Sequence, residues 1–155
     1  MTNILFICHG NICRSPMAEF VMKELVRRAG LAAAFSIDSK AARTDELGND
    51  THPGSTRKLQ EQGIPFQRRQ ARLVGRGDYQ RYDFLICMDR ENYNDMLRLF
   101  GGDPEHKISL LLSFAGETRE VADPWYTGDF NQTYEDIVKG CRGLLRTLGA
   151  KGSAN

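Results

Sequence analysis

The sequence lacks long apolar runs, an excess of charge of one sign, and a cysteine-rich pattern. No apolar run reaches roughly 18 residues, so we expect no transmembrane helix. Lys and Arg total 21 against 20 Asp and Glu, and a net charge of +1 argues against a strongly basic nucleic-acid binder and an acidic disordered chain. The apolar N-terminus has no basic leader or cleavage site. We therefore expect no signal peptide, a cytoplasmic protein, and neither nucleic acid nor membrane as a partner.

Cysteine is scarce, and its spacing matches no zinc-binding pattern. Without a signal peptide, we expect reduced thiols rather than disulfides. The histidines are not grouped as ligands either, so no metal site is predicted. The four cysteines are Cys8, Cys13, Cys87 and Cys141, and the three histidines are His9, His52 and His106.

Short apolar runs alternate with segments of helical periodicity along the 155 residues. Candidate strands lie at 3–8, 35–39, 66–73, 84–88 and 108–112. Candidate helices lie at 15–30, 55–62, 90–100 and 129–148. This alternation predicts an α/β fold with a parallel sheet covered by helices on both faces, because parallel strands need crossover connections. We expect a single domain over residues 1–150, followed by a frayed tail at 151–155.

Residues 8–15, Cys-His-Gly-Asn-Ile-Cys-Arg-Ser, form a candidate anion-binding loop between the first strand and the first helix. Gly10 and Asn11 tolerate the backbone conformations of a tight curl, which points amides inward at a helix N-terminus. Arg14 can close the ring by gripping two phosphate oxygens. Cys8 lies at its floor, where positive groups favour the thiolate, and Ser15 can donate a hydrogen bond to it. The loop therefore predicts phosphoryl transfer to Cys8.

Such a reaction also needs a proton donor for the leaving oxygen. Asp123, followed by Pro124, Trp125 and Tyr126, is the best candidate. After the leaving group departs, the Asp123 carboxylate can activate the water that hydrolyses the thiophosphate. Trp125 and Tyr126 are candidates to wall a cleft for an aromatic group, although core packing fits Trp125 equally well.

Blander interpretations apply to several of these residues. A cysteine at a strand end is commonly a core residue, but the Gly-Asn pair and the flanking strand and helix favour the catalytic interpretation of Cys8. Cys13 is either a disulfide partner for oxidised Cys8 or a buried thiol without a role. Tyr126 lies in an exposed-looking loop and is a candidate phosphorylation site, which would make a tyrosine kinase a partner.

The segment Asn-Ile-Leu-Phe-Ile-Cys-His-Gly-Asn-Ile-Cys-Arg-Ser-Pro-Met-Ala-Glu at 3–19 resembles the motif of the low-molecular-weight protein tyrosine phosphatases. The Asp-Pro-Trp-Tyr segment at 123–126 resembles their late general-acid loop, and the apolar strand that ends in Met88-Asp89 is similar to their central strand. The resemblance implies a four-stranded parallel sheet, no metal or organic cofactor, and a phosphocysteine intermediate. It also implies phosphotyrosine-containing protein substrates and inorganic phosphate as a product.

The resemblance assigns roles residue by residue. It implies that Cys8 is the nucleophile, that Arg14 binds the phosphoryl group, and that Asp123 is the general acid and then the base. It implies that Asn11 shapes the loop and that Cys13 can trap Cys8 as a reversible disulfide. The phosphate-binding residues would be His9, Gly10, Asn11, Ile12, Cys13, Arg14 and Ser15, the last also stabilising the thiolate.

Two segments depart from the family pattern. The lid loop (residues 41–47), which often carries an aromatic residue in relatives, has none here, and we expect Asp45 and Leu47 to border the substrate cleft instead. In the segment Arg69-Gln70-Ala71-Arg72, Arg69 stands where relatives often carry a histidine that supports the loop asparagine.

Three other functions compete with a tyrosine phosphatase. Related arsenate reductases use a relay of further cysteines, which Cys87 in a strand and Cys141 on a helix stripe do not resemble. Arginine phosphatases carry Thr where this chain has Ile12, and an apolar residue favours an aryl ring because a buried guanidinium needs a hydrogen-bond partner. A non-enzymatic phosphotyrosine-binding module would need neither Cys8 nor Asp123.

Overall fold

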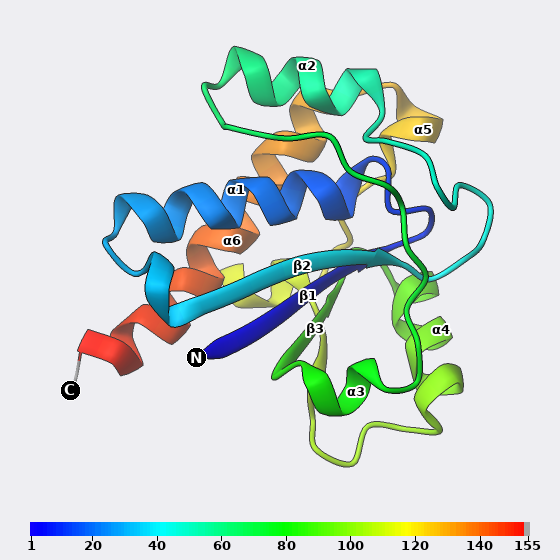
Figure 1. Cartoon of the computed structure of the whole chain (residues 1–155), viewed down its shortest axis with the longest axis vertical. Coiled ribbons are helices and arrows are strands. Elements are labelled where there is room, and N and C mark those ends of the chain that lie inside the picture. Colours follow the sequence, from blue (N-terminus) through cyan, green and yellow to red (C-terminus); the bar gives the residue numbers. More distant parts are fainter. Residues whose placement is uncertain (154–155) are drawn as a thin grey trace.

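Four parallel strands in the order β2-β1-β3-β4 form the central sheet of the computed structural model, which describes residues 1–153 (Figure 1). The strands are β1 (Thr2–Cys8), β2 (Phe35–Ala41), β3 (Phe84–Cys87) and β4 (Ile108–Leu110). The helices are α1 (Arg14–Arg28), η1 (Ala32–Ala34), α2 (Pro53–Glu61), α3 (Asp78–Arg81), α4 (Arg90–Phe100), η2 (Leu111–Ala115), α5 (Pro124–Thr127) and α6 (Phe130–Ser153). The α/β class and the four-stranded parallel sheet expected from the sequence are confirmed.

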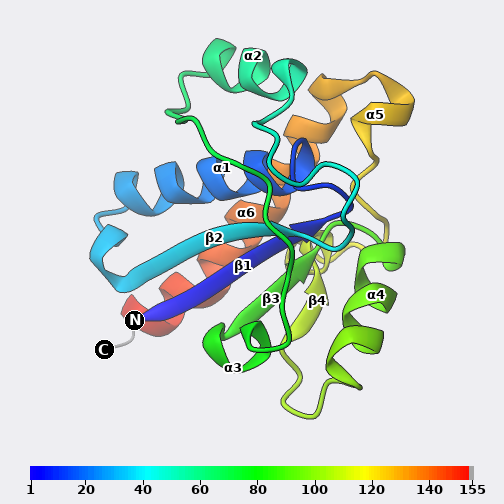
Figure 2. The ribbon, with the colours of Figure 1, turned by 45° about the vertical axis from the view of Figure 1, so that its right-hand side comes forward.

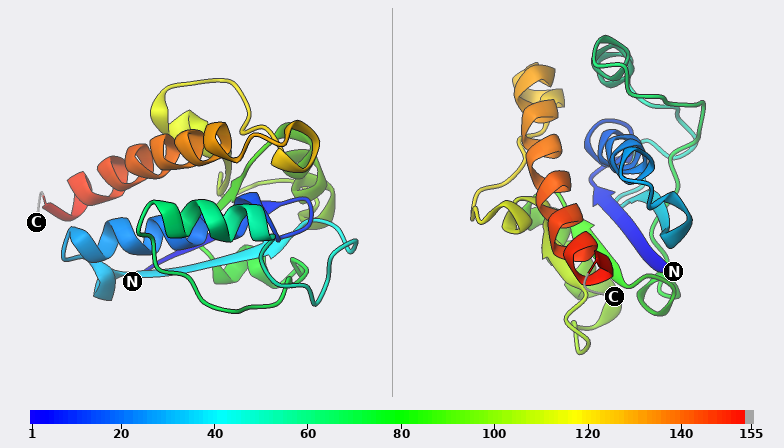
Figure 3. Two further views of the ribbon diagram at one scale, coloured as in Figure 1. Left: turned by 90° about the horizontal axis from the view of Figure 1, so that it is seen from above. Right: turned by 90° about the vertical axis from the view of Figure 1, so that its left-hand side faces the viewer.

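Strand β1 is buried on both faces, as its continuous apolar run predicts. Ile4 and Phe6 belong to a core shared with α1 and α6, whereas Leu5 and Ile7 belong to a core shared with α3 and α4. All four side chains are fully buried. The helices therefore cover both faces of the sheet, α1 and α6 on one side and α3 and α4 on the other (Figures 2 and 3).

The strand predicted at 66–73 is wrong. This segment makes only one isolated bridge, between Ala41 and Leu73, and otherwise crosses the molecule as irregular backbone. Its Arg and Gln side chains offer no alternating apolar face to bury. Its backbone instead braces neighbouring loops, since Ala71 N donates to Asn49 O at 2.8 Å.

Several predicted boundaries also differ from the structure, those of the last strand and the last helix among them. The last strand was expected over 108–112 but ends at Leu110, because the chain then turns into the 3₁₀ helix η2. The last helix, expected to stop at Leu148, continues to Ser153, so it includes part of the predicted tail. Residues 154 and 155 of that tail lie outside the described residues.

The strand order places a topological switch point at the end of β1. This strand pairs with β2 on one side and with β3 on the other, and Cys8 is its last residue. Open parallel sheets bind ligands in the crevice beyond such a point. Within the described range, no helix combines the length and the apolar character needed to cross a membrane.

Candidate active site

The anion-binding loop curls through a left-handed residue. Asn11 has φ = 58° and is fully buried, a conformation that asparagine adopts more readily than most residues. Its Nδ2 donates to Ser15 Oγ at 2.8 Å and to Ser39 Oγ at 2.9 Å, and its Oδ1 accepts from the Arg72 amide at 3.2 Å. The Asn11 side chain thus ties the loop to α1, to β2 and to the irregular 66–73 segment.

Arg69, which departs from the pattern that the sequence resembles, supports the loop through Asn11. Its guanidinium donates to the main-chain oxygen of Asn11 at 2.7 Å and also to Asn11 Oδ1. Burial lowers the pKa of Arg69, but an arginine remains a cation at any physiological pH. The loop is therefore braced by a permanent positive charge, where a histidine would titrate.

Cys8 and Ser15 meet at the floor of the loop. The Cys8 sulfur is buried and lies 3.0 Å from Ser15 Oγ and 3.4 Å from the Ser15 amide. Ser15 lies in the first turn of α1, whose free amides and dipole carry partial positive charge. The structure thus places the Ser15 hydroxyl and amide within hydrogen-bonding distance of the sulfur, and the role of this contact stays a prediction.

The Arg14 guanidinium is buried and held from two sides. Its Nη1 donates to Asp89 Oδ2 at 2.7 Å and to the Val121 carbonyl at 2.9 Å, and its Nη2 lies 3.3 Å from Asp123 Oδ2. Burial works to lower the pKa of Arg14, but the charges on Cys8, Asp89 and Asp123 outweigh it and leave that pKa raised. Asp89 is itself fixed as the N-cap of α4, in a capping box with Asn92. These contacts set the plane of the guanidinium in advance.

The Asp123 loop (residues 121–129) brings the predicted proton donor to the same place. Asp123 caps the short helix α5, and its Oδ1 accepts from the Trp125 amide at 3.0 Å. Thr133 Oγ1 donates to the Ala122 carbonyl at 3.1 Å and anchors the loop to α6. Trp125 is 59% exposed, so it is not a core residue, and Tyr126 is 81% exposed.

A cleft opens above Cys8 between the anion-binding loop, the lid loop and the Asp123 loop. Asp45 lies in its wall as expected, but Leu47 is not among the lining residues and Glu46 takes that place. Glu46 closes against the loop, where a Cβ on Gly10 would lie 3.0 Å from Glu46 Cγ. The lining residues are Cys8, His9, Gly10, Ile12, Cys13, Arg14, Asp45, Glu46, Asp123, Trp125 and Tyr126.

Comparison with known proteins decides the family. The sequence model of the low molecular weight phosphotyrosine protein phosphatases matches residues 3–154. The chain belongs to this family. It is 35% identical over 150 residues to the low molecular weight protein-tyrosine-phosphatase YfkJ of Bacillus subtilis, an alignment that covers 96% of each chain. The crystal structure of YfkJ matches with a TM-score of 0.93, over 97% of this chain and 96% of that one.

Two proteins from animals are also similar to this chain in sequence or structure. The Gallus gallus low molecular weight phosphotyrosine protein phosphatase is 35% identical over 148 residues, covering 92% of this chain and 93% of that protein. The crystal structure of DARP, a drosophila arginine phosphatase, matches with a TM-score of 0.85 at 28% identity, over 96% of this chain and 98% of that one. The family recognised in the 3–19 segment is therefore confirmed.

The other cysteines of this family member are free, buried thiols. Burial, together with the charges of Cys8 and Asp123, raises the pKa of Cys13 to about 12, so this thiol is protonated at neutral pH. Cys87 and Cys141 are fully buried, and burial raises the pKa of each. In the part of the chain that the structure describes, no group of three His, Cys, Asp or Glu residues is placed to hold a metal ion.

His9 joins the lid loop to α4 at the rim of the cleft, a contact that the sequence did not predict. Its Nε2 lies 2.5 Å from Asp45 Oδ2 and its Nδ1 lies 3.1 Å from Glu91 Oε1. The hydrogen bond to Asp45 raises the pKa of His9 more than burial lowers it, and Glu91 raises it further. An imidazolium that donates to both carboxylates fits this geometry.

The His9 bridge makes a testable prediction about stability. Because the folded-state pKa is raised above 6.5, the bridge stabilises the fold fully below pH 6.5 and loses this effect as pH rises through the higher folded-state pKa. We expect His9→Asn to lower the free energy of unfolding by less than about 1 kcal/mol at pH 6, since both carboxylates are exposed, and by less at pH 9. Urea unfolding between these pH values measures the difference. A difference in free energy of unfolding between wild type and His9→Asn that grows with pH would contradict the bridge. Asp45→Asn, which removes a carboxylate partner of His9, is the matched control.

Proposed function

We propose that the protein hydrolyses phosphotyrosine in proteins through a phosphocysteine intermediate on Cys8. One observation carries this proposal: a buried cysteine sulfur, a pre-oriented buried arginine and an aspartate converge on one cleft, with Arg14 Nη2 3.3 Å from Asp123 Oδ2. These are the nucleophile, the anion-binding group and the acid that a two-step phosphoryl transfer needs.

In the first step, the Cys8 thiolate attacks phosphorus and the bond from phosphorus to the tyrosine oxygen breaks. Arg14 and the amides of residues 9–14 bind the non-bridging oxygens, whose charge the transition state spreads. The proton of the Asp123 carboxyl moves to the leaving oxygen, so that neutral tyrosine departs.

In the second step, the Asp123 carboxylate takes a proton from water as the water oxygen attacks phosphorus. The bond between sulfur and phosphorus breaks, and the electron pair returns to Cys8 as thiolate. The Ser15 hydroxyl, 3.0 Å from the sulfur, donates to this departing thiolate. Inorganic phosphate is the product, and the enzyme returns to its starting state.

The cleft walls support an aryl substrate. Trp125 and Tyr126 contribute exposed aromatic side chains to the lining, and the buried, apolar Ile12 is part of it. A flat phenyl ring fits between such groups without leaving a polar group unpaired. The proposal includes phosphotyrosine proteins as substrates, Tyr126 as a target for a tyrosine kinase, and the cytoplasm as the compartment that keeps Cys8 reduced.

Two related chemistries are less well supported. A thiol relay of the arsenate reductase type needs accessible cysteines, whereas Cys87 and Cys141 are 0% exposed. A phosphoarginine substrate has one favourable feature, the carboxylates of Asp45 and Glu46 in the cleft wall, and DARP shares the fold. Ile12 opposes it, because it offers no hydrogen bond to a guanidinium.

Phosphate release from a phosphotyrosine peptide and a phosphoarginine peptide of the same sequence tests the proposal. We expect release from phosphotyrosine and at least about tenfold slower release from phosphoarginine, because only the former leaves no buried polar group unpaired. A preference for phosphoarginine would overturn the substrate class, and Ile12→Thr would then raise that preference further. Release from neither peptide would overturn the function.

A further inference from the structure

We propose that His52 is a positioning residue that docks the Asp123 loop onto the anion-binding loop and so places the Asp123 carboxyl at the leaving oxygen. The inference rests on the proposed function and deepens it. His52 belongs to none of the groups that contact the phosphoryl site, and it does not line the cleft. Its place at the start of α2 nevertheless joins the two loops that must act together.

The backbone around His52 is fixed to the anion-binding loop. The His52 amide donates to the Ile12 carbonyl at 2.7 Å. Three residues later, the buried Ser55 hydroxyl donates to the Cys13 carbonyl at 3.3 Å. His52 is also the N-cap of α2, since its Nδ1 accepts from the Gly54 amide at 2.9 Å. The N-terminus of α2 is therefore held by hydrogen bonds to the loop that contains the proposed nucleophile.

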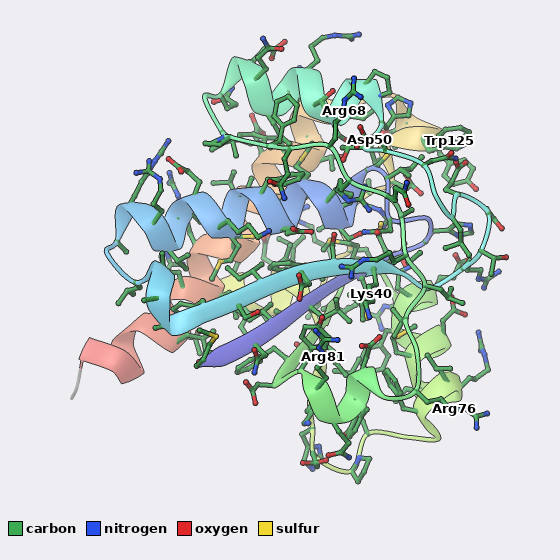
Figure 4. The ribbon with its side chains drawn as sticks, viewed as in Figure 1. Lys40, Asp50, Arg68, Arg76, Arg81 and Trp125 are labelled. Carbon is green, nitrogen blue, oxygen red and sulfur yellow. The ribbon has the colours of Figure 1, made fainter. Side chains whose placement is uncertain are left out.

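The ring of His52 faces the other loop. It stacks on Phe130 at 5.3 Å with an interplanar angle of 22°, and it meets Trp125 edge-on at 5.9 Å. Trp125 is bound through its amide to Asp123 Oδ1. Figure 4 shows Trp125 on α5, at the same end of the molecule as Asp50, which lies two residues before His52 in the chain. The contact thus runs from the His52 ring through Trp125 to the proposed proton donor.

Gly54 makes room for this junction. A Cβ on Gly54 would lie 2.3 Å from the Phe130 ring, closer than real contacts allow. Phe130 packs in turn against the cluster of Ile12, Cys13 and Ala71 beside the anion-binding loop. In the segment His52-Pro53-Gly54, His52 therefore supplies the aromatic ring and the N-cap of α2. Gly54 leaves the space that the Phe130 ring occupies.

The Asp123 loop needs such a contact because the hydrogen bonds that tie it to the rest of the fold lie outside α5, at residues 121–123 before it and at Asp129 after it. Val121 is held by its amide to the Met88 carbonyl and by its own carbonyl to Arg14, and Ala122 is held by Thr133. Beyond Asp123, α5 has only four residues, and its two aromatic side chains are more than half exposed. A displacement of about 1 Å at a reacting group can cost about a hundredfold in rate.

Two substitutions separate the functions of His52. His52→Asn keeps a side-chain acceptor for the α2 N-cap but removes the ring, whereas His52→Phe keeps a ring and removes the acceptor. We expect His52→Asn to slow aryl phosphates with poor leaving groups about tenfold or more and those with good leaving groups much less, because only the former depend on the proton donor. His52→Phe restores the wild-type leaving-group dependence even where it lowers stability. Gly54→Ala, which displaces Phe130, is expected to reproduce the His52→Asn pattern.

The single tryptophan gives a second readout that does not depend on turnover. Acrylamide should quench the fluorescence of Trp125 more strongly in His52→Asn than in the wild type, because the indole ring loses its contact. In His52→Phe the quenching should stay near the wild-type value. An equal slowing of all leaving groups, or an unchanged dependence in His52→Asn, overturns the positioning role. A wild type that is inactive on every aryl phosphate overturns the proposed function and this inference with it. If the wild type is active and His52→Asn shows the same dependence on leaving group, the inference alone is overturned.

Discussion

Cys8→Ser is expected to lower phosphate release from phosphotyrosine by about 10⁴-fold or more, because the variant lacks the proposed nucleophile. A serine hydroxyl is a weak nucleophile unless a neighbouring base takes its proton. The Cys8 sulfur has the Ser15 hydroxyl and amide as its neighbours, and neither is a base. The environment that favours a thiolate therefore does not rescue an alcohol. Initial rates of phosphate release at pH 6 measure the loss.

The same variant should still bind inorganic phosphate, because Arg14 and the loop amides are unchanged. Calorimetric titration with phosphate checks that the loop is folded, and intact binding separates loss of chemistry from loss of structure. Cys141→Ala is the matched control, since it removes a buried thiol from the core under α6 and leaves the cleft untouched. A Cys8→Ser enzyme within about tenfold of wild type would contradict a phosphocysteine intermediate.

The local part of the site could be predicted from the sequence because it is contiguous. The anion-binding loop lies between one strand and one helix, so Cys8, Asn11 and Ser15 meet within a few residues of one another. Asn11 adopts the left-handed conformation, which its short polar side chain allows and for which the sequence marked it as a turn residue. The contact between Cys8 and Ser15 needs only the curl of the loop and the first turn of α1.

The partners that orient Arg14 could not be predicted in the same way. Asp89 and Val121 are 75 and 107 residues away in the sequence, and they meet Arg14 only because parallel strands end at one edge of the sheet. The Met88-Asp89 strand end was visible in the sequence, but not its contact with the guanidinium. Arg69 was visible as a departure from the family, yet only the structure shows it bound to Asn11.

Segments without a regular pattern account for the wrong predictions. The 66–73 segment has apolar residues at its two ends, Phe66 and Leu73, but is otherwise rich in Arg and Gln, and apart from one bridge its hydrogen bonds serve loops rather than a ladder. His52 carried no signal in the sequence, because the role of an imidazole depends on what surrounds its ring. The lid loop turns Glu46 rather than Leu47 toward the cleft, a difference of one residue that composition does not determine.

Asp123→Asn tests the proton donor without removing its structural contact. Asparagine still accepts the Trp125 amide as the N-cap of α5, but its amide group cannot release a proton to the leaving oxygen. We expect hydrolysis of phosphotyrosine, whose phenol has a pKa near 10, to fall by about 10²–10⁴-fold. An aryl phosphate with a far more acidic phenol should be affected much less, since its oxygen departs without a proton. Rates over a series of aryl phosphates give the dependence on leaving group.

The pH profile distinguishes a proton donor from a residue that only shapes the loop. A general acid must carry its proton to act, so we expect wild-type activity on poor leaving groups to fall on the alkaline side and this limb to disappear in Asp123→Asn. Asp129→Asn, at an exposed carboxylate of the same loop, is the matched control and should keep both the limb and the leaving-group dependence. Equal slowing of all substrates by Asp123→Asn, with the alkaline limb intact, would show that another group donates the proton and that Asp123 serves Arg14 alone.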